Sequence, residues 1–152
     1  MEQTKIKGDI AEAKALFEFS KRKIPVLIPW GDKDRYDMVI EYNQRFLKVQ
    51  VKYCGEECNG AIICYARSSQ DNRTHKNYFL YKDDVDFLFF YNEKYDKCAL
   101  VPIKEIGEQS TISLRITPTK NNQRKNIRFF DDYSIDKTLC VETLHENSFQ
   151  KE

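Results

Sequence analysis

The sequence predicts an α/β fold, with a central mixed β-sheet of about five strands flanked by helices. A segment near the amino end has helical periodicity, and two later segments carry apolar residues at every second position. At 152 residues, the chain suits one domain with a modest core. We therefore expect a single domain over residues 1–152, with a frayed tail over about 145–152.

The first helix is expected over Gly8–Lys23. At about 100° per residue, its apolar side chains share one broad arc and its charged side chains lie opposite. The arc holds Ile10, Ala13, Ala15, Leu16, Phe17 and Phe19, and the opposite side holds Lys14, Glu18, Lys21 and Arg22. Glu12 is an exception, because it falls inside the apolar arc. A buried carboxylate must be paired, protonated or bound to a cation, so Glu12 is the first candidate site residue.

The next elements are extended. Pro25 and Pro29 exclude helix from the stretch 24–29, and a polar loop follows. Strands are then expected over Arg35–Tyr42 and Arg45–Cys54, with Asn43-Gln44 as the turn between them. The remaining expected strands are Ala61–Ala66, Asp86–Tyr91, Cys98–Ile103, Ser110–Thr117 and Asn126–Phe130, with a polar connection over Arg67–Asn77 and a helical turn over Ile103–Gly107.

The register of the first hairpin brings polar side chains together. A two-residue turn at Asn43-Gln44 places Asp37 opposite Gln50, and Arg35 opposite Lys52. Residues two apart on a strand share a face, and so do directly opposed residues. Asp37, Gln50 and Lys52 are therefore expected on one patch of the sheet.

This grouping suits metal-assisted phosphodiester hydrolysis. Asp37 and the Gln50 carbonyl supply oxygen ligands for a hard divalent cation, expected to be Mg²⁺ with Mn²⁺ as a substitute. Glu12 could complete the ligand set through an outer-sphere water. Lys52 could orient or activate the attacking water, or stabilise charge on the phosphate. The candidate catalytic residues are thus Glu12, Asp37, Gln50 and Lys52, with Asp37, Gln50 and Glu12 as metal ligands.

Asp37 followed by Gln50-Val51-Lys52 resembles the motif of the PD-(D/E)xK nuclease superfamily, in which a helix with an inward acid precedes the core hairpin. Tyr36 replaces the usual proline, and Gln50 replaces an acid, which removes one charge from the metal site. Further runs resemble the small members associated with group I introns: Gly8–Glu12, Asp84–Leu88, Leu100–Ile103, Ser113–Ile116, Pro118–Asn122 and Ile127–Phe129.

The resemblance implies a restriction-endonuclease-like core and site-specific cleavage of double-stranded DNA in intron homing. It also implies a homotetramer, with a dimer as the next choice; a chain this small needs symmetric assembly to read a long DNA site. Three alternatives stay open: a Holliday-junction or repair nuclease, a catalytically inactive DNA-binding module, favoured by Gln50, and a protein-interaction domain.

Candidate DNA contacts fall in two segments. No acid occurs between Gln109 and Phe130, whereas five basic residues lie there, so this stretch can hold phosphates although the net charge is only +1. Its candidates are Arg115, Lys120, Asn121, Asn122, Gln123, Arg124 and Lys125, and the second set is Arg35, Arg67, Ser69, Gln70, Asn72 and Arg73.

Two further expectations concern location and cysteines. No signal peptide and no apolar run long enough to span a bilayer is visible, so a cytoplasmic location with no membrane partner is expected. Cys54, Cys58 and Cys64 are close in sequence, but a structural zinc site needs a fourth ligand and none has convincing spacing. The cysteines are therefore expected to be reduced thiols.

Overall fold

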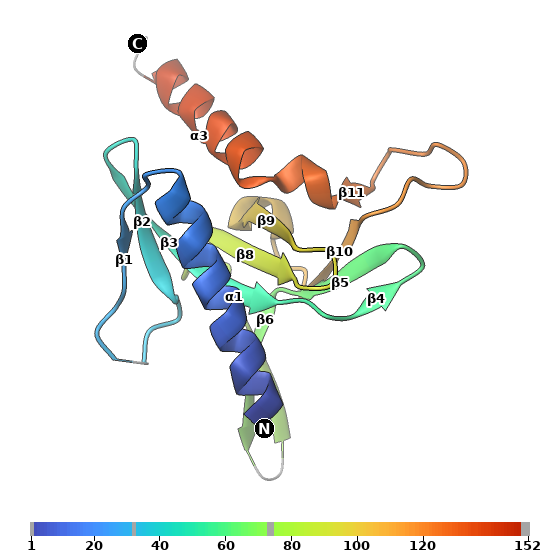
Figure 1. Ribbon diagram of the computed structural model, residues 1–152, viewed down its shortest axis with the longest axis horizontal. Coiled ribbons are helices and arrows are strands. Elements are labelled where there is room, and N and C mark those ends of the chain that lie inside the picture. Colours follow the sequence, from blue (N-terminus) through green and yellow to red (C-terminus); the bar gives the residue numbers. More distant parts are fainter. Residues whose placement is uncertain (1, 32, 73–74, 150–152) are drawn as a thin grey trace.

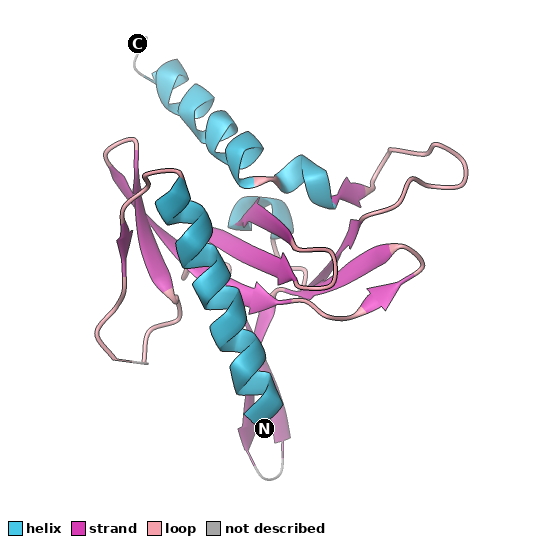
Figure 2. Cartoon of the chain, in the orientation of Figure 1, coloured by secondary structure: helices cyan, strands magenta, loops and turns pink. Residues whose placement is uncertain are grey.

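A five-stranded mixed sheet forms the centre of the computed structural model, which describes residues 2–31, 33–72 and 75–149. A four-stranded sheet and a separate hairpin accompany it, and helices flank it (Figures 1 and 2). The predicted α/β class, with a mixed sheet and flanking helices, is confirmed. The elements are α1 (Glu2–Lys21), β1 (Val26–Leu27), β2 (Met38–Tyr42), β3 (Arg45–Tyr53), β4 (Glu57–Cys58), β5 (Ala61–Tyr65), β6 (Arg67–Asn72), β7 (His75–Leu80), β8 (Phe87–Asn92), β9 (Lys97–Pro102), α2 (Ile103–Ile106), β10 (Thr111–Arg115), β11 (Arg128–Phe129), the 3₁₀ helix η1 (Phe130–Tyr133) and α3 (Ile135–Phe149).

The central sheet has the strand order β1-β2-β3-β8-β9. Strands β3 and β8 run parallel, and every other neighbouring pair is antiparallel. All six residues of β8 are buried, because both faces of this strand are covered. A strand covered on both faces needs a continuous apolar run rather than an alternating one, and Phe87–Tyr91 supplies it.

The core is divided by the central sheet into two clusters. On one face, Ala15 and Phe19 of α1 and Leu139 of α3 pack against β3 and β8, with the rings of Phe19 and Phe89 5.8 Å apart. On the other face, β5, β10 and α2 pack against β8 and β9. The smaller sheet, ordered β11-β10-β5-β4, therefore takes the place of a second helical layer.

The first helix differs from the prediction in extent and in orientation. It begins at Glu2 rather than Gly8, and it buries Ala11, Ala15, Glu18 and Phe19. Leu16 and Phe17, expected in the core, are 43% and 57% exposed. The small side chains of Ala11 and Ala15 let the helix lie close to the sheet, and Glu18 is tolerated because Arg22 and Lys14 pair with it at 2.6 and 3.1 Å.

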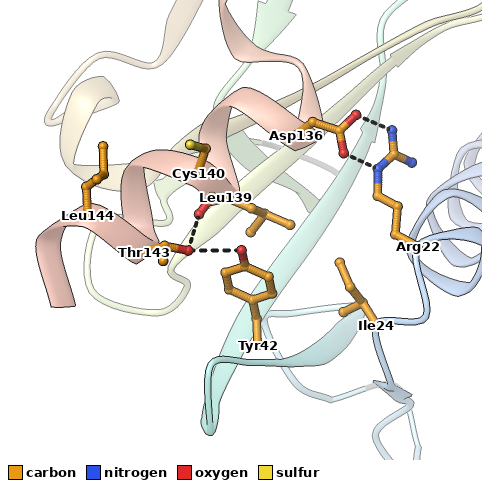
Figure 3. A pocket seen from close by; sticks show the side chains of 8 residues that line it. All are labelled: Arg22, Ile24, Tyr42, Asp136, Leu139, Cys140, Thr143 and Leu144. Atoms are coloured by element: carbon orange, nitrogen blue, oxygen red, sulfur yellow. Dashed lines mark hydrogen bonds and ion pairs between the residues drawn. The ribbon is translucent and has the colours of Figure 1, made fainter. Parts of the chain in front are cut away.

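The C-terminal helix was not predicted. Helix α3 continues through Phe149, although a frayed tail was expected from about residue 145; residues 150–152 lie outside the described part. Its first turns attach through Arg22, whose guanidinium donates to both carboxylate oxygens of Asp136 at 2.8 and 3.1 Å. Further along, Thr143 bonds the Tyr42 hydroxyl at 3.0 Å, and these residues line a cavity of about 530 Å³ (Figure 3).

The polar stretch Arg67–Asn77 was expected to be a connection, and this was wrong. Strands β6 and β7 form an antiparallel hairpin there, with Arg67 paired to Leu80 and Asn72 to His75. The hairpin projects from the body of the molecule (Figure 1). The sequence did not predict this hairpin because it is polar, and apolar alternation is the main sequence signal for a strand.

Candidate active site

The β2–β3 hairpin has the predicted register. Its pairs run from Tyr42 with Arg45 to Met38 with Val49. Asn43 and Gln44 both have positive φ, 50° and 62°, which is the conformation of a tight two-residue turn whose twist matches that of the strands. The turn therefore fixes which residues of β3 lie near the start of β2.

At Asp37 the register breaks. The backbone N–H of Asp37 donates to the Val49 carbonyl at 3.0 Å, although Val49 is already the partner of Met38. Asp37 therefore precedes β2 and is not paired one-to-one with Gln50, and the expected pairing of Arg35 with Lys52 does not form either. Such a bulge redirects side chains and is common next to active sites.

The bulge directs the Asp37 carboxylate to the backbone of β3. Its Oδ2 accepts a hydrogen bond from the N–H of Val51 at 2.8 Å. Val51 stands between Gln50 and Lys52, so the carboxylate is held at the triplet itself. Asp37 therefore lies beside the backbone of the Gln50-Val51-Lys52 triplet through a side-chain bond, and not through a cross-strand pair.

Gln50 and Lys52 lie on the face of β3 opposite to its core residues. Val49 and Val51 are buried beneath α1, whereas Gln50 and Lys52 are half-buried. The amide of Gln50 makes no hydrogen bond to any residue in the described part of the chain, so its carbonyl oxygen is available to a ligand.

Lys52 is held by two contacts. Its Nζ donates to the carbonyl of Arg67 at 3.1 Å and lies 4.8 Å from the centroid of the Tyr81 ring. Burial raises the pKa of Asp37, and the charge of Lys52 opposes that rise without reversing it. No direct ion pair joins the two side chains within the described residues. The Asp37 carboxylate and the Lys52 ammonium are therefore not bonded to each other.

Glu12 lies near Asp37 but is exposed, not inside the buried face as the arc suggested. Partial burial raises the pKa of Glu12, and the carboxylates of Asp37 and Asp9 raise it further. Burial also raises the pKa of Asp37, while the Val51 N–H and Lys52 act in the opposite direction. Two neighbouring acids thus repel each other, and a cation between them would relieve that repulsion.

The donor set fits a hard cation better than zinc. Two carboxylates and one amide oxygen suit Mg²⁺ or Mn²⁺. Within the described ranges, no group of three or more His, Cys, Asp or Glu side chains could hold a metal, which agrees with an amide standing where a third acid would be. The same finding gives no support to a zinc site at Cys54, Cys58 and Cys64.

The expected DNA contacts occupy two projecting segments. Residues 120–126 form an exposed loop that extends from the body (Figure 1); it contains Lys120, Asn121, Asn122, Gln123, Arg124 and Lys125. Arg115, at its base, is half-buried and donates to the Thr117 carbonyl at 3.1 Å.

The second segment is the β6–β7 hairpin. The Arg67 guanidinium lies 3.9 Å from the centroid of the Tyr78 ring. Arg35 is bonded internally: its guanidinium donates to Asp84, to the Leu80 carbonyl and to the Ser68 hydroxyl. Ser69, Gln70 and Asn72 lie in β6, and Arg73 lies outside the described residues.

Sequence reasoning missed Tyr81 and the Arg67 carbonyl, which hold Lys52. Both belong to the hairpin or directly follow it, so they could be found only with the hairpin itself. No periodicity or spacing in the sequence connects Tyr81 with Lys52, since their contact depends on how β7 returns to the central sheet.

A mixed sheet covered by a helix, with a carboxylate and a lysine close to each other at its central hairpin, is typical of the restriction-endonuclease-like class of nucleases. A family model described as PD-(D/E)XK endonuclease matches residues 2–136, and the chain belongs to this family. Membership makes it a nuclease of the hydrolase class, with DNA as the substrate that the family implies, and such nucleases generally use divalent metal ions.

A solved structure supports the same conclusion. The chain is similar to a bacterial homing endonuclease, I-Ssp6803I, with 30% sequence identity over 98% of each chain and a TM-score of 0.76. No curated protein matches the chain significantly. Across the residues that the structure describes, no helix is long and apolar enough to cross a membrane.

Proposed function

We propose that the protein is a site-specific double-strand DNA endonuclease of the intron-homing type, acting by metal-dependent phosphodiester hydrolysis. The observation that carries the proposal is the bond between the Asp37 carboxylate and the Val51 N–H. It holds an acid beside an amide oxygen and a lysine, which are the groups that this hydrolysis needs. The likeness to a homing endonuclease along nearly the whole chain supports the homing assignment.

In this proposal Asp37, the Gln50 carbonyl and Glu12 hold Mg²⁺, with Mn²⁺ as a substitute. When bound, the cation would polarise the scissile phosphate and lower the pKa of a coordinated water. Asp37 and Gln50 would supply direct oxygen ligands, and Glu12, which is more exposed, would act through a water. The partial burial of Asp37 and Gln50 would strengthen the interaction with a cation, because less bulk water screens it.

Lys52 would orient the attacking water or stabilise charge that builds on the phosphate. Its ammonium carries several N–H donors, and within the described residues only the Arg67 carbonyl accepts from it. Donors therefore remain for a water or a phosphate oxygen. Because no salt bridge to Asp37 has to be broken, a substrate oxygen could enter between the two groups.

The two projecting segments would bind the DNA. A two-stranded ribbon such as β6–β7 fits the major groove, and the loop over 120–126 offers cations for phosphates and amides for base edges. The proposed contacts are Arg67, Ser69, Gln70 and Asn72 in the hairpin, and Arg115, Lys120, Asn121, Asn122, Gln123, Arg124 and Lys125 in or beside the loop. Arg73, which lies outside the described residues, is also a proposed contact. Arg35 remains a proposed contact at the base of the hairpin, although its guanidinium is already bonded. A DNA substrate also agrees with the cytoplasmic location expected from the sequence.

Assembly into a homotetramer, or failing that a dimer, is also proposed. Apolar side chains remain exposed on α1 and α3, and α3 extends past the sheet (Figure 1). Phe17 is 57% exposed and Leu144 is 64% exposed. Burying such side chains between copies is favourable, and a symmetric assembly would present several hairpins to one DNA site.

A cleavage assay tests the activity. Duplexes that carry candidate intron-insertion sites, and a four-way junction, are incubated with the protein in Mg²⁺, in Mn²⁺ or in EDTA. We expect both strands of one duplex to be cut in either metal and neither in EDTA. Lys52→Ala should abolish cutting, whereas Lys104→Ala, which removes an exposed lysine from α2, should not. Cutting in EDTA or by Lys52→Ala would overturn the mechanism, binding without cutting would favour an inactive module, and preference for the junction would favour a resolvase.

A further inference from the structure

Tyr81 is a buried residue whose ring contacts two positively charged side chains. It follows β7, is only 4% exposed and belongs to the core cluster beneath β8 and β9. Two cations lie against its ring: Lys52 Nζ and Arg35 Cζ, each 4.8 Å from the ring centroid. Its hydroxyl makes no hydrogen bond to the described residues. The polar contacts of this side chain within the described residues are therefore those of the two cations with its ring.

The two cations come from the segments that carry the candidate site. Lys52 is the candidate catalytic lysine, and Arg35 stands two residues before Asp37. The Arg35 charge is offset by its ion pair with Asp84, whereas Lys52 has no carboxylate partner within the described residues. For Lys52, the ring and the Arg67 carbonyl are the groups that hold the ammonium.

A lysine side chain is long and flexible, so a single hydrogen bond leaves its ammonium many positions. An aromatic face attracts a cation electrostatically, and the attraction strengthens when the pair is shielded from water. The buried Tyr81 ring therefore restricts the Lys52 ammonium to the region between the hairpin base and the Asp37 carboxylate. A small error in the position of a catalytic group can reduce a rate about 100-fold.

We propose that Tyr81 is a positioning residue of the nuclease, which holds the Lys52 ammonium against its ring so that Lys52 meets the scissile phosphate. The proposal rests on the proposed role of Lys52 in cleavage. It also connects catalysis with DNA binding, since Tyr81 and the Arg67 carbonyl both belong to the base of the β6–β7 hairpin. A hairpin seated in a groove would then hold the lysine in place.

Fluorination of the ring tests this proposal. Phenylalanine bearing zero, one, two or three fluorines is incorporated at position 81, because fluorine weakens the ring's attraction for a cation with little change of shape. Single-turnover cleavage at saturating protein should slow progressively, by about tenfold across the series, while DNA affinity stays within about twofold. The unfluorinated Tyr81→Phe should keep most of the wild-type rate, and Tyr81→Leu should lose more than the fluorinated forms.

Phe90 is the matched control. It is fully buried in the same cluster and is the strand partner of Lys52 in β8, but no described cation lies on its ring. The same fluorine series at Phe90 should leave the rate unchanged. A flat series at position 81, or equal slowing at both positions, would contradict the proposal.

A second measurement does not depend on activity. A ring face shifts the NMR signals of the lysine methylene beside it upfield, so the Lys52 Hε signals should lie upfield of those of exposed Lys104 and return to the ordinary position in Tyr81→Leu. Unshifted Lys52 signals in the wild type would overturn the placement. If the wild type cuts no DNA but the shift is present, the proposed function fails while the contact itself stands.

Discussion

The Asp37 carboxylate and the Val51 backbone N–H are joined by a hydrogen bond of 2.8 Å. Val51 is buried beneath α1, so this bond joins the acid to a strand that packs in the core. It occupies one carboxylate oxygen and leaves the other for a ligand. The backbone of β3 thus positions the acid. The positions of Gln50 and Lys52 are set by the same strand, because they flank Val51.

Gln50 is a proposed metal ligand that stands where an acid is usual in the family. Gln50→Ala would remove its oxygen, and we expect cleavage to fall by about 100-fold or more while DNA binding persists. Gln50→Glu restores the acid that is usual in the family and adds a charge. It should bind Mg²⁺ more tightly, measured by titration calorimetry, and retain cleavage. Equal cleavage by wild type and Gln50→Ala would remove Gln50 from the metal site.

The loop over 120–126 is expected to bind phosphates. Replacing Lys120, Arg124 and Lys125 together by alanine should weaken DNA binding and reduce the slope of log K against log salt by about 2–3. A control triple, Lys82, Lys94 and Lys137 to alanine, removes the same charge elsewhere. Fluorescence anisotropy at several salt concentrations measures both, and identical slopes in the two triples would exclude a specific role for the loop.

The ion network that joins α1 to α3 predicts a pH dependence of stability. Burial alone would raise the pKa of Glu18, but hydrogen bonds from Arg22 and Lys14 outweigh it and lower the pKa below the ordinary 4.5. The hydrogen bond from Arg22 likewise lowers the pKa of Asp136 (Figure 3). A carboxylate with a lowered pKa stabilises the fold above its unfolded value and loses that contribution as the pH falls.

Glu18→Gln should therefore destabilise the protein at pH 7 by about 1–3 kcal/mol. The difference from wild type should shrink as the pH falls below 4.5 and through the lowered pKa. Urea unfolding across this range measures it, with Glu41→Gln, an exposed carboxylate of β2, as the control. A difference that stays constant down to pH 3 would show that the ion pairs do not cause it.

Assembly is tested at α3. In sedimentation equilibrium the wild type should have about four times the chain mass of 18.1 kDa. Val141→Glu with Leu144→Glu places charges on the exposed apolar side of the helix and should reduce the mass to a dimer or a monomer, because burying unpaired charges is costly. An unchanged tetramer would move the interface to another surface, and a monomeric wild type would contradict the assembly.

The central sheet could be predicted because its signals are local. The tight turn at Asn43-Gln44 and the alternation of β3 determine the register, and the apolar run of β8 identifies its buried strand. The register argument brought Asp37, Gln50 and Lys52 together, although it assumed regular pairing where a bulge occurs. A bulge depends on the path by which the preceding segment enters the strand. The sequence pattern does not indicate that path.

The remaining elements depended on tertiary contacts. The β6–β7 hairpin has a polar sequence over Arg67–Asn77, so no apolar alternation indicates it. Helix α3 is attached through Asp136 and Thr143, whose partners Arg22 and Tyr42 are distant in the sequence. Leu16 and Phe17 were predicted to be buried because they lie in the apolar arc of the first helix. The arc does not indicate which part of the helix surface the sheet covers.

The account depends most directly on Asp37. Single-turnover cleavage of a cognate duplex in Mg²⁺ should be at least about 100-fold slower for Asp37→Asn than for wild type. The variant should keep its fold and bind the duplex within about threefold, because the amide oxygen can still accept from the Val51 N–H. Cleavage by Asp37→Asn at the wild-type rate would contradict the central claim, namely that the protein cuts DNA at the site formed by Asp37, Gln50 and Lys52.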